Sequence, residues 1–195
     1  ILHDEFTMLG RVNTDKDVFK FGDSYYMYLQ NQLFRDNAAG SFAALLHGIS
    51  HDAAMLKYLN NDTNVKGRAN ENLAREIMEL FSMGRDQGYS ELDIRQGARA
   101  LTGYTYDVAT GQFRFISDRH DPDSKMIFAK QGAYSGDDFV QLILDTPYPP
   151  RFLARQLGVP RSLVSVARGA TSRHKAVHVG SPVSVDRLHR LGPAN

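Results

Sequence analysis

The segment NENLAREIMELF, residues 70–81, decides the fold of this 195-residue chain. Its apolar side chains follow the i, i+4, i+7 and i+8 spacing of one helical face: Leu73, Ile77, Leu80 and Phe81. Asn70 is a suitable N-cap residue, and Gly84 is a suitable residue to end the helix. We therefore predict a helix that starts at Asn70, ends at Gly84 and buries one face against other helices.

Helical periodicity and capping residues continue on both sides of this segment. We expect further helices over residues 24–34 and 41–49, after Asp52, from Ser90 to about Leu101, from Ser135, and over residues 151–157. Ser90 with Asp93, and Ser135 with Asp138, have the spacing of capping boxes. Three prolines, at positions 147, 149 and 150, are expected to break the chain before the last helix.

One short segment alternates aromatic and polar residues instead. Residues 104–106 and 113–115 flank a Thr110-Gly111 turn, which is typical of a small hairpin. Two strands alone are marginally stable, so we interpret this hairpin as an insertion between helices. The sequence thus predicts a mainly α protein: a single helical domain with a small β-hairpin insertion around residues 104–116.

Composition excludes several classes of protein. A net charge of +1 gives no overall field that would attract nucleic acid or an anionic membrane. Without cysteine the chain has no disulfide, no thiolate nucleophile and no Cys-ligated metal. No run approaches the roughly 18 apolar residues of a membrane span. The chain starts at Ile1 without a signal-peptide pattern, so we expect that its natural start and any targeting segment are missing.

Charge is distributed unevenly along the chain. Residues 159–195 contain six Lys or Arg and one acid, Asp186, a balance of +5, against −4 for the rest. This stretch has no Phe, Tyr or Trp, so it can bury little area. It could be a basic tail for a polyanion, a disordered end or a product of out-of-frame translation. We favour the last two, and predict a helical domain over residues 1–157, a disordered or non-native tail over 158–195, and no nucleic-acid binding.

Motifs from about Gln30 to Leu157 also form a recognisable series. They include Leu33-Phe34-Arg35, Ala54-Met55-Leu56, Tyr58, Leu59, Asn61, Asn64, Lys66, Gly67, most of residues 70–81, Gly84, Tyr89, Glu91, Asp93, residues 98–103, His120, Asp121, Phe139, Arg151, Phe152, Ala154 and Arg155. This series resembles a large bacterial family known as domain of unknown function 1800. The resemblance implies a helical protein that is exported to the periplasm, the envelope or the medium. It also implies a partner from a phosphatase-like family, domain of unknown function 1501, but no reaction.

The chain departs from the family pattern at both ends. Family members often carry Trp-His-x-His-Phe near their start, whereas this chain has Leu2-His3-Asp4-Glu5-Phe6, which argues against a two-histidine site there. After Leu157 the family places further aromatic residues, whereas this chain has Gly158 and the basic stretch. We therefore expect a central fragment of the family domain with a divergent or frame-shifted end.

Glu76 is the carboxylate closest to the apolar face of the 70–81 helix. At about 100° per residue it falls at the edge of that face, whereas Arg75 and Glu79 point to the opposite side. A partly buried carboxylate needs a partner, so Glu76 is a candidate either for function or for structural anchoring. Arg75 is four residues from both Glu71 and Glu79, and we expect surface ion pairs there.

The Asn-rich run LNNDTN, residues 59–64, resembles a cation-binding loop. Positions 1, 3, 5 and 12 of an EF-hand spacing are occupied by Asn60, Asp62, Asn64 and Glu71. Position 6 carries Val65 instead of the required Gly, so the loop is not an EF-hand. Two interpretations stay open: a site for a divalent cation such as calcium, with Asp62, Asn64 and Glu76 as ligands, or a turn that bonds its own backbone.

His120 and Asp121 place a base and an acid side by side in a polar loop. Together with Glu76 they form the candidate catalytic set, and the candidate ligand-binding residues are Asn60, Asn64, Asn72 and Arg75. We consider an envelope interaction protein whose polar motifs fix a scaffold, a metal-assisted hydrolase-like enzyme using Glu76, His120 and Asp62, and a nucleic-acid binder acting through its tail. We favour a binding or scaffold role, with the hydrolase as the alternative.

Overall fold

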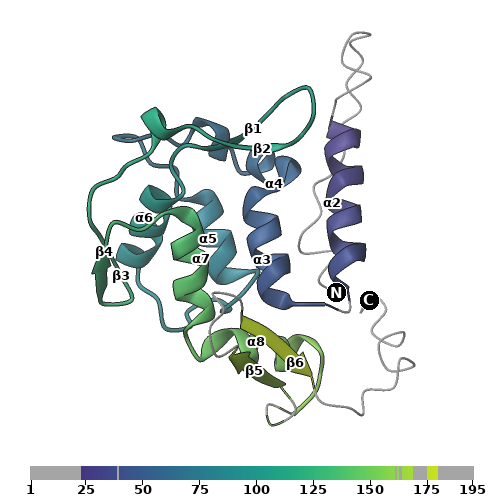
Figure 1. Cartoon of the computed structure of the whole chain (residues 1–195). Coiled ribbons are helices and arrows are strands. Elements are labelled where there is room, and N and C mark those ends of the chain that lie inside the picture. Colours follow the sequence, from purple (N-terminus) through teal and green to yellow (C-terminus); the bar gives the residue numbers. More distant parts are fainter. Residues whose placement is uncertain (1–22, 39, 161, 163, 169–174, 180–195) are drawn as a thin grey trace.

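The computed structural model describes residues 23–38, 40–160, 162, 164–168 and 175–179 (Figure 1). Helices dominate this part of the chain, which confirms the predicted mainly α class. The helices are α2 (Asp23–Asn37), α3 (Phe42–His51), α4 (Ala53–Tyr58), α5 (Asn72–Glu79), α6 (Glu91–Ala100), α7 (Gly136–Leu144) and α8 (Tyr148–Gln156), with short 3-10 helices η1 (Asn61–Thr63) and η2 (Ser117–Arg119). That they form a single domain stays a prediction.

The strands of the described residues form separate antiparallel pairs. The pairs are β1 (Tyr104–Tyr106) with β2 (Phe113–Phe115), β3 (Lys125–Ile127) with β4 (Lys130–Gly132), and β5 (Val164–Arg168) with β6 (Lys175–Val179). The first pair is the predicted hairpin, in the register Tyr104 to Phe115. The other two were not predicted.

The core lies where α3, α5, α6, α7 and α8 meet. Each contributes buried apolar side chains, among them Leu46, Ile77, Ile94, Phe139 and Leu153. The apolar face predicted for α5 is part of this core, because Leu73, Ile77 and Phe81 are buried and Leu80 packs against them. Helix α2 lies outside α3 and α4, where Tyr26 is buried against Ala53 and Ala54 (Figure 1).

Helix starts follow the predicted capping chemistry. Ser90 and Asp93 form a capping box on α6, and Ser135 and Asp138 form a second one on α7. Asp52 caps α4, since its Oδ2 accepts a hydrogen bond from the Met55 backbone N–H at 2.8 Å. These local predictions are confirmed because each depends on residues only three positions apart.

The predicted end of α5 is wrong. The helix stops at Glu79, and the backbone then turns more widely, with the N–H of Met83 and of Gly84 both donating to Met78 O. Gly84 ends this segment at φ +94°, a conformation that glycine adopts without strain. The predicted start is also wrong, because α5 begins at Asn72 rather than directly after Asn70.

The predicted start of α8 is three residues late. Tyr148 is its first residue, so Pro149 and Pro150 lie inside the first turn. The N–H groups of a first turn have no helical acceptor, and proline therefore costs nothing there. Prolines that were expected to break the chain instead begin the helix.

The β3–β4 hairpin turns at Phe128 and Ala129, which both have positive φ, at 49° and 59°. A two-residue loop with positive φ at both positions is normally signalled by Asn-Gly or Asp-Gly. Phe-Ala carries no such signal. Here the Phe128 N–H donates to Asp93 Oδ1 at 2.7 Å, so a side chain of α6 helps to fix the turn.

Part of the predicted tail is described as the β5–β6 pair. In it Val164 belongs to the core and is 1% exposed, β5 contacts α8, and β6 contacts α3. Much of the remaining segment lies outside the described residues, so the division at residue 157 stays a prediction. None of the described helices is both long and apolar enough to cross a membrane.

Candidate functional site

The Asn-rich loop is fixed to the end of α6 by buried side-chain amides. Asn61 is 1% exposed, and its Nδ2 donates to the carbonyl oxygens of Leu101 at 3.2 Å and Tyr104 at 3.0 Å. Asn64 is equally buried, and its Nδ2 donates to Asn61 Oδ1 at 3.0 Å and to Ala98 O at 3.0 Å. The two amides thus satisfy backbone carbonyls where α6 ends and β1 begins.

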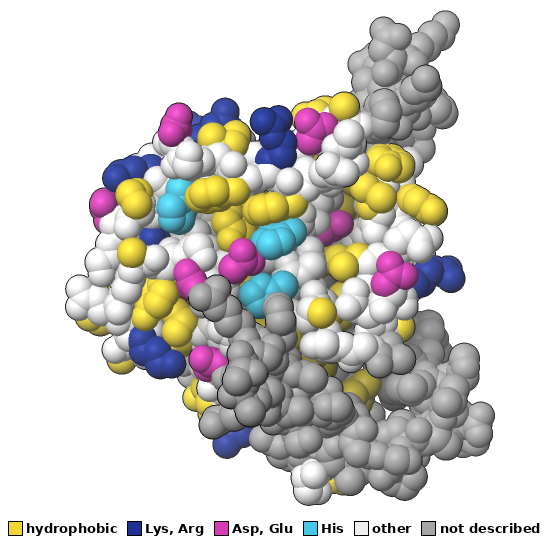
Figure 2. Space-filling model, viewed as in Figure 1, with side chains coloured by type: hydrophobic (Ala, Val, Ile, Leu, Met, Phe, Trp, Pro, Cys, Tyr) yellow, Lys and Arg dark blue, Asp and Glu magenta, His cyan; other side chains and the backbone are white. Residues whose placement is uncertain are grey.

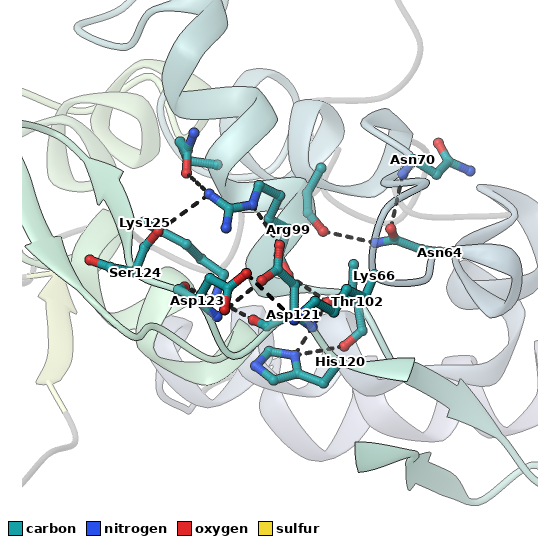
Figure 3. Close-up of polar contacts among 12 residues, drawn as sticks. Asn64, Lys66, Asn70, Arg99, Thr102, His120, Asp121, Asp123, Ser124 and Lys125 are labelled. Atoms are coloured by element: carbon teal, nitrogen blue, oxygen red, sulfur yellow. Dashed lines mark hydrogen bonds and ion pairs between the residues drawn. The ribbon is translucent and has the colours of Figure 1, made fainter. Parts of the chain in front are cut away.

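A third amide closes the loop on itself. The Asn70 backbone N–H donates to Asn64 Oδ1 at 2.9 Å (Figure 3), and its Nδ2 donates to the carbonyls of Leu59 and Asn60 at 3.1 and 3.0 Å. Its Oδ1 accepts from the Asn72 N–H at 3.0 Å, which is how it serves the start of α5. We call Asn61, Asn64 and Asn70 the asparagine network.

Backbone hydrogen bonds bring this loop next to the loop that carries His120. Lys66 N donates to Arg119 O at 2.8 Å, Gly103 N donates to Asn64 O at 3.0 Å, and Ile116 N donates to Gly103 O at 2.9 Å. Gly103 has φ +80°, and a Cβ there would lie 2.6 Å from Ile116 O. Only glycine fits this crossing of two chain segments.

Asp121 is the centre of an ionic group beyond the end of α6. Its Oδ2 accepts from Arg99 Nε at 2.6 Å, its Oδ1 accepts from Asp123 N at 3.0 Å, and its N–H donates to Thr102 Oγ1 at 2.8 Å (Figure 3). Burial alone would raise the pKa of Asp121. The hydrogen bonds from Arg99 and Asp123, and the charges of Arg99 and Lys125, outweigh burial and lower that pKa.

Lys125 is buried at the same place, with 1% exposure. Its Nζ donates to the carbonyl oxygens of Asp121 at 2.6 Å and Asp123 at 3.0 Å. Burial lowers the pKa of Lys125, although the nearby Asp121 carboxylate opposes this. The ammonium group thereby ties together the turn that follows His120. Lys125 and Arg99 are also weaker candidates from the sequence, but nothing in the local pattern of Lys125 marks it as buried.

His120 is half-buried, and its Nδ1 lies 3.0 Å from Thr102 O. Since a carbonyl oxygen can only accept, Nδ1 is the donor in this contact. The ring packs edge-on against Phe115, with 5.3 Å between centroids. The structure therefore places His120 and Asp121 next to the loop that carries Asn64. Both side chains have hydrogen-bond partners in the chain.

Arg75 binds carboxylates of its own chain. Its guanidinium contacts Glu71 at 3.1 Å and Glu79 at 3.3 Å, the predicted pairs, and both oxygens of Glu91 at 2.8 and 2.9 Å. The hydrogen bond to Glu91, together with that to Glu79, raises the pKa of Arg75. Glu91 begins α6, so this ion-pair group joins α5 to the start of α6.

The remaining predicted residues lie around these groups. Glu76 is half-buried on α5, as its position at the edge of the apolar face predicted, and Asp62 is half-buried in η1. Asn60 and Asn72 are exposed, Asn60 at φ +55°. Across the described residues, no three His, Asp or Glu side chains gather in a way that could hold a metal. The calcium interpretation and the catalytic and ligand roles therefore stay predictions.

Sequence reasoning missed a cluster of two histidines and an aspartate. His47 Nδ1 and His51 Nε2 on α3 lie 3.3 and 3.0 Å from the same Asp137 Oδ1 at the start of α7. The His51 contact is outside hydrogen-bond geometry, so it is an electrostatic contact. The imidazoles of His47 and then His51 lower the pKa of Asp137. An i, i+4 pair of histidines was the available signal, but the predicted helix ended at residue 49 and left His51 out.

Aromatic rings connect this cluster to His120. His51 stacks on Phe113 at 4.0 Å between centroids, Tyr104 meets Phe113 at 4.9 Å and Phe115 at 5.8 Å, and Phe115 meets His120. Tyr104 Oη also accepts from the Asp137 N–H at 2.9 Å. Figure 2 shows histidines between hydrophobic and acidic side chains on this side of the molecule. We define the His–aromatic face as His47, His51, Tyr104, Phe113, Phe115, His120 and Asp137.

Comparisons with known proteins give one match. A family model described as a protein of unknown function, DUF1800, matches residues 10–167. Neither the curated proteins nor the solved structures give a significant match. The match begins before, and ends after, the 30–157 segment whose motifs suggested it, and its last residues include most of β5. The chain belongs to the DUF1800 family of proteins of unknown function.

Proposed function

We propose that this protein is a binding protein of an exported bacterial system, in which the family motif builds the scaffold and the His–aromatic face binds the partner. The main observation behind the proposal is the asparagine network. Its amides make hydrogen bonds to other groups of the same chain, so their polar atoms stabilise the fold. Polar side chains that are buried and fully paired fix one conformation.

The His–aromatic face differs in that it is partly exposed, although its Tyr104 is buried. Phe115 is 47% exposed, and the imidazoles of His47 and His51 are 23% and 30% exposed. Aromatic rings with polar edges are typical of protein interfaces, because they bury a large area with few lost rotamers. The asparagine network lies directly behind this face, since Asn61 binds the carbonyl of Tyr104.

The hydrolase alternative finds less support in the geometry. Asp121 is held ionised by Arg99 and Lys125, with a lowered pKa, so it is unsuited to act as a general acid. His120 uses Nδ1 for Thr102 O, which leaves Nε2 as its one basic atom. Among the described residues, no three His, Asp or Glu side chains form a group that could hold a metal ion for such a mechanism.

For the partner we propose a phosphatase-like protein of the domain of unknown function 1501 family. Calorimetric titration of such a protein with wild type, Phe115→Ser and Leu92→Ser tests this assignment. Leu92 is 44% exposed on α6 outside the His–aromatic face, which makes it a matched control. We expect Phe115→Ser to weaken binding by about tenfold or more while its melting temperature matches wild type, and Leu92→Ser to bind normally.

Asn64→Ala tests the scaffold in a separate measurement of unfolding. We expect a loss of about 2–3 kcal/mol in the free energy of unfolding, because buried groups lose their partners. Asn60→Gly is the control and should cost little, since Asn60 has positive φ and an exposed side chain. Unchanged binding by Phe115→Ser would contradict the proposed surface. A hydrolytic activity lost in both Glu76→Gln and His120→Ala would contradict the binding role.

A further inference from the structure

A separate pocket opens between the chain that follows α5 and helix α8. Its volume is about 390 Å³, which falls within the size range of small-molecule sites. Apolar side chains of Leu80, Met83 and Phe152 line it, together with the guanidinium-bearing side chains of Arg85, Arg151 and Arg155. No residue of the His–aromatic face takes part, so this pocket is independent of the proposed function.

The two arginines that α8 contributes to the pocket lack balancing charge among the described residues. Arg151 and Arg155 are exposed and lie one turn apart on α8, where like charges destabilise a helix. Within the described residues, no acidic side chain lies within ion-pair distance of either. Arg151 lies over the Tyr148 ring, 6.0 Å from its centroid, a contact that helps to orient the guanidinium.

Glu79, the one carboxylate among the described residues that line the pocket, is already paired. Glu79 lies 3.5 Å from Arg85 and 3.3 Å from Arg75, and its side chain is 16% exposed. Its charge is therefore compensated by two guanidinium groups on the α5 side. The α8 side of the pocket keeps two positive charges above an apolar floor, and Gln87 and Gln156 add amide groups to the lining.

We propose that this pocket binds a small organic oxyanion, whose carboxylate or phosphate group contacts Arg151 and Arg155 and whose apolar body rests on Leu80, Met83 and Phe152. Guanidinium groups offer paired N–H donors that match both oxyanions, and they do so better than the point charge of lysine. The apolar floor favours a ligand that carries a hydrocarbon or aromatic group over a bare inorganic ion.

Calorimetric titration of the full chain with four probes tests this assignment. The probes are phenyl phosphate, benzoate, inorganic phosphate and benzyl alcohol, the last as the neutral analogue. We expect saturable one-site binding of phenyl phosphate or benzoate, at least tenfold weaker binding of inorganic phosphate, and none of benzyl alcohol. Whichever of the first two binds more tightly identifies a phosphate or a carboxylate as the preferred group.

Variants then locate the site. Arg151→Gln and Arg155→Gln should each weaken the better probe by about tenfold, and Arg151→Lys should recover only part of that loss. Arg95→Gln is the matched control, because Arg95 is exposed on α6 and does not line the pocket. All three arginine side chains are exposed, so the melting temperatures of the four variants should stay at the wild-type value.

Three results would overturn the assignment. The first is no saturable binding of either organic anion. The second is equal binding of inorganic phosphate and phenyl phosphate, which would remove the role of the apolar floor. The third is binding that Arg151→Gln and Arg155→Gln leave unchanged, or that Arg95→Gln weakens to the same extent.

Discussion

Asp52 caps helix α4, although burial disfavours the charged form of its carboxyl group. Its Oδ2 accepts from Met55 N and from Gln30 Nε2, each at 2.8 Å, while burial raises its pKa to about 6 from an ordinary 3.8. Between these values the folded state binds more protons than the unfolded state. The contribution of Asp52 to stability is therefore largest near pH 4 and falls as the pH rises through about 6.

We expect Asp52→Asn to remove this pH dependence and to raise the free energy of unfolding at pH 7 by about 1–3 kcal/mol. An amide oxygen can still accept at the cap, and the new N–H₂ group can serve Gln30 Oε1, which is buried without a partner. Urea unfolding at pH 4.5 and pH 7 measures the change. Asp52→Ala, which removes the cap, should lose about 1 kcal/mol relative to Asp52→Asn. If the free energy of unfolding of Asp52→Asn changed between pH 4.5 and pH 7 as much as that of wild type, Asp52 would not be the source of this pH dependence.

Single residues were predictable where their partners are local. The Arg75 pairs with Glu71 and Glu79, and the half-burial of Glu76, follow from helical spacing alone. Asn61 was not predictable in this way, because its acceptors at Leu101 and Tyr104 lie 40 and 43 residues along the chain. A sequence shows that an amide is present, but it does not show which distant carbonyl it meets.

Among the helices, α6 and α7 approach each other closely at one position. A Cβ on Gly97 would lie 2.6 Å from the Phe139 ring at Cε2, and both residues are buried. Glycine within a helix costs about 1 kcal/mol relative to alanine, so propensity alone favours Gly97→Ala. The ring is packed in the core and cannot move freely, and overpacking of this kind costs more than the propensity gains.

We therefore expect Gly97→Ala to lower the free energy of unfolding by about 1–3 kcal/mol in urea titrations. A double variant with Phe139→Leu supplies the control, because a smaller side chain makes room for the added methyl group. Its loss should be smaller than the sum of the two single losses. Equal or greater stability of Gly97→Ala would show that the two helices can separate at no cost.

Helices and hairpins, like single contacts, could be predicted where the residues that define them lie close together in the sequence. The capping boxes at Ser90 and Ser135 were found because three-residue spacing defines them. The β3–β4 hairpin was missed because its turn is made by Phe128 and Ala129 and is fixed by Asp93, 35 residues earlier. The His–aromatic face was missed because α3, the first hairpin and α7 meet there only in the folded chain.

At the scale of the whole molecule, the β5–β6 pair links the last helix to an early one. β5 contacts α8 and β6 contacts α3, and Val164 is buried in the core. The sequence predicted a disordered or non-native tail from residue 158, because this stretch has no aromatic residue. The burial of Val164 and the backbone pairing of β5 with β6 connect this part of the stretch to the helices, and neither feature shows in composition.

We expect a chain that ends at Gly158 to melt about 5 °C or more below the full chain, since burial of Val164 alone is worth about 1.5–3 kcal/mol. Calorimetry of both chains measures the difference. Full-length Val164→Ala is the companion variant and should show part of the same loss. Identical melting temperatures would instead support the division of the chain at residue 157.

The asparagine network makes the turn before α5 insensitive to the pH and the salt concentration of the solution. Amide groups carry no net charge and do not titrate, so the bonds of Asn61, Asn64 and Asn70 respond neither to acidity nor to dissolved salt. The ion pairs of Arg75 on α5, which are partly exposed, are weakened by salt. The turn that precedes α5 therefore keeps its hydrogen bonds in concentrated salt as in dilute solution, whereas a rise in ionic strength weakens the charged link between α5 and α6.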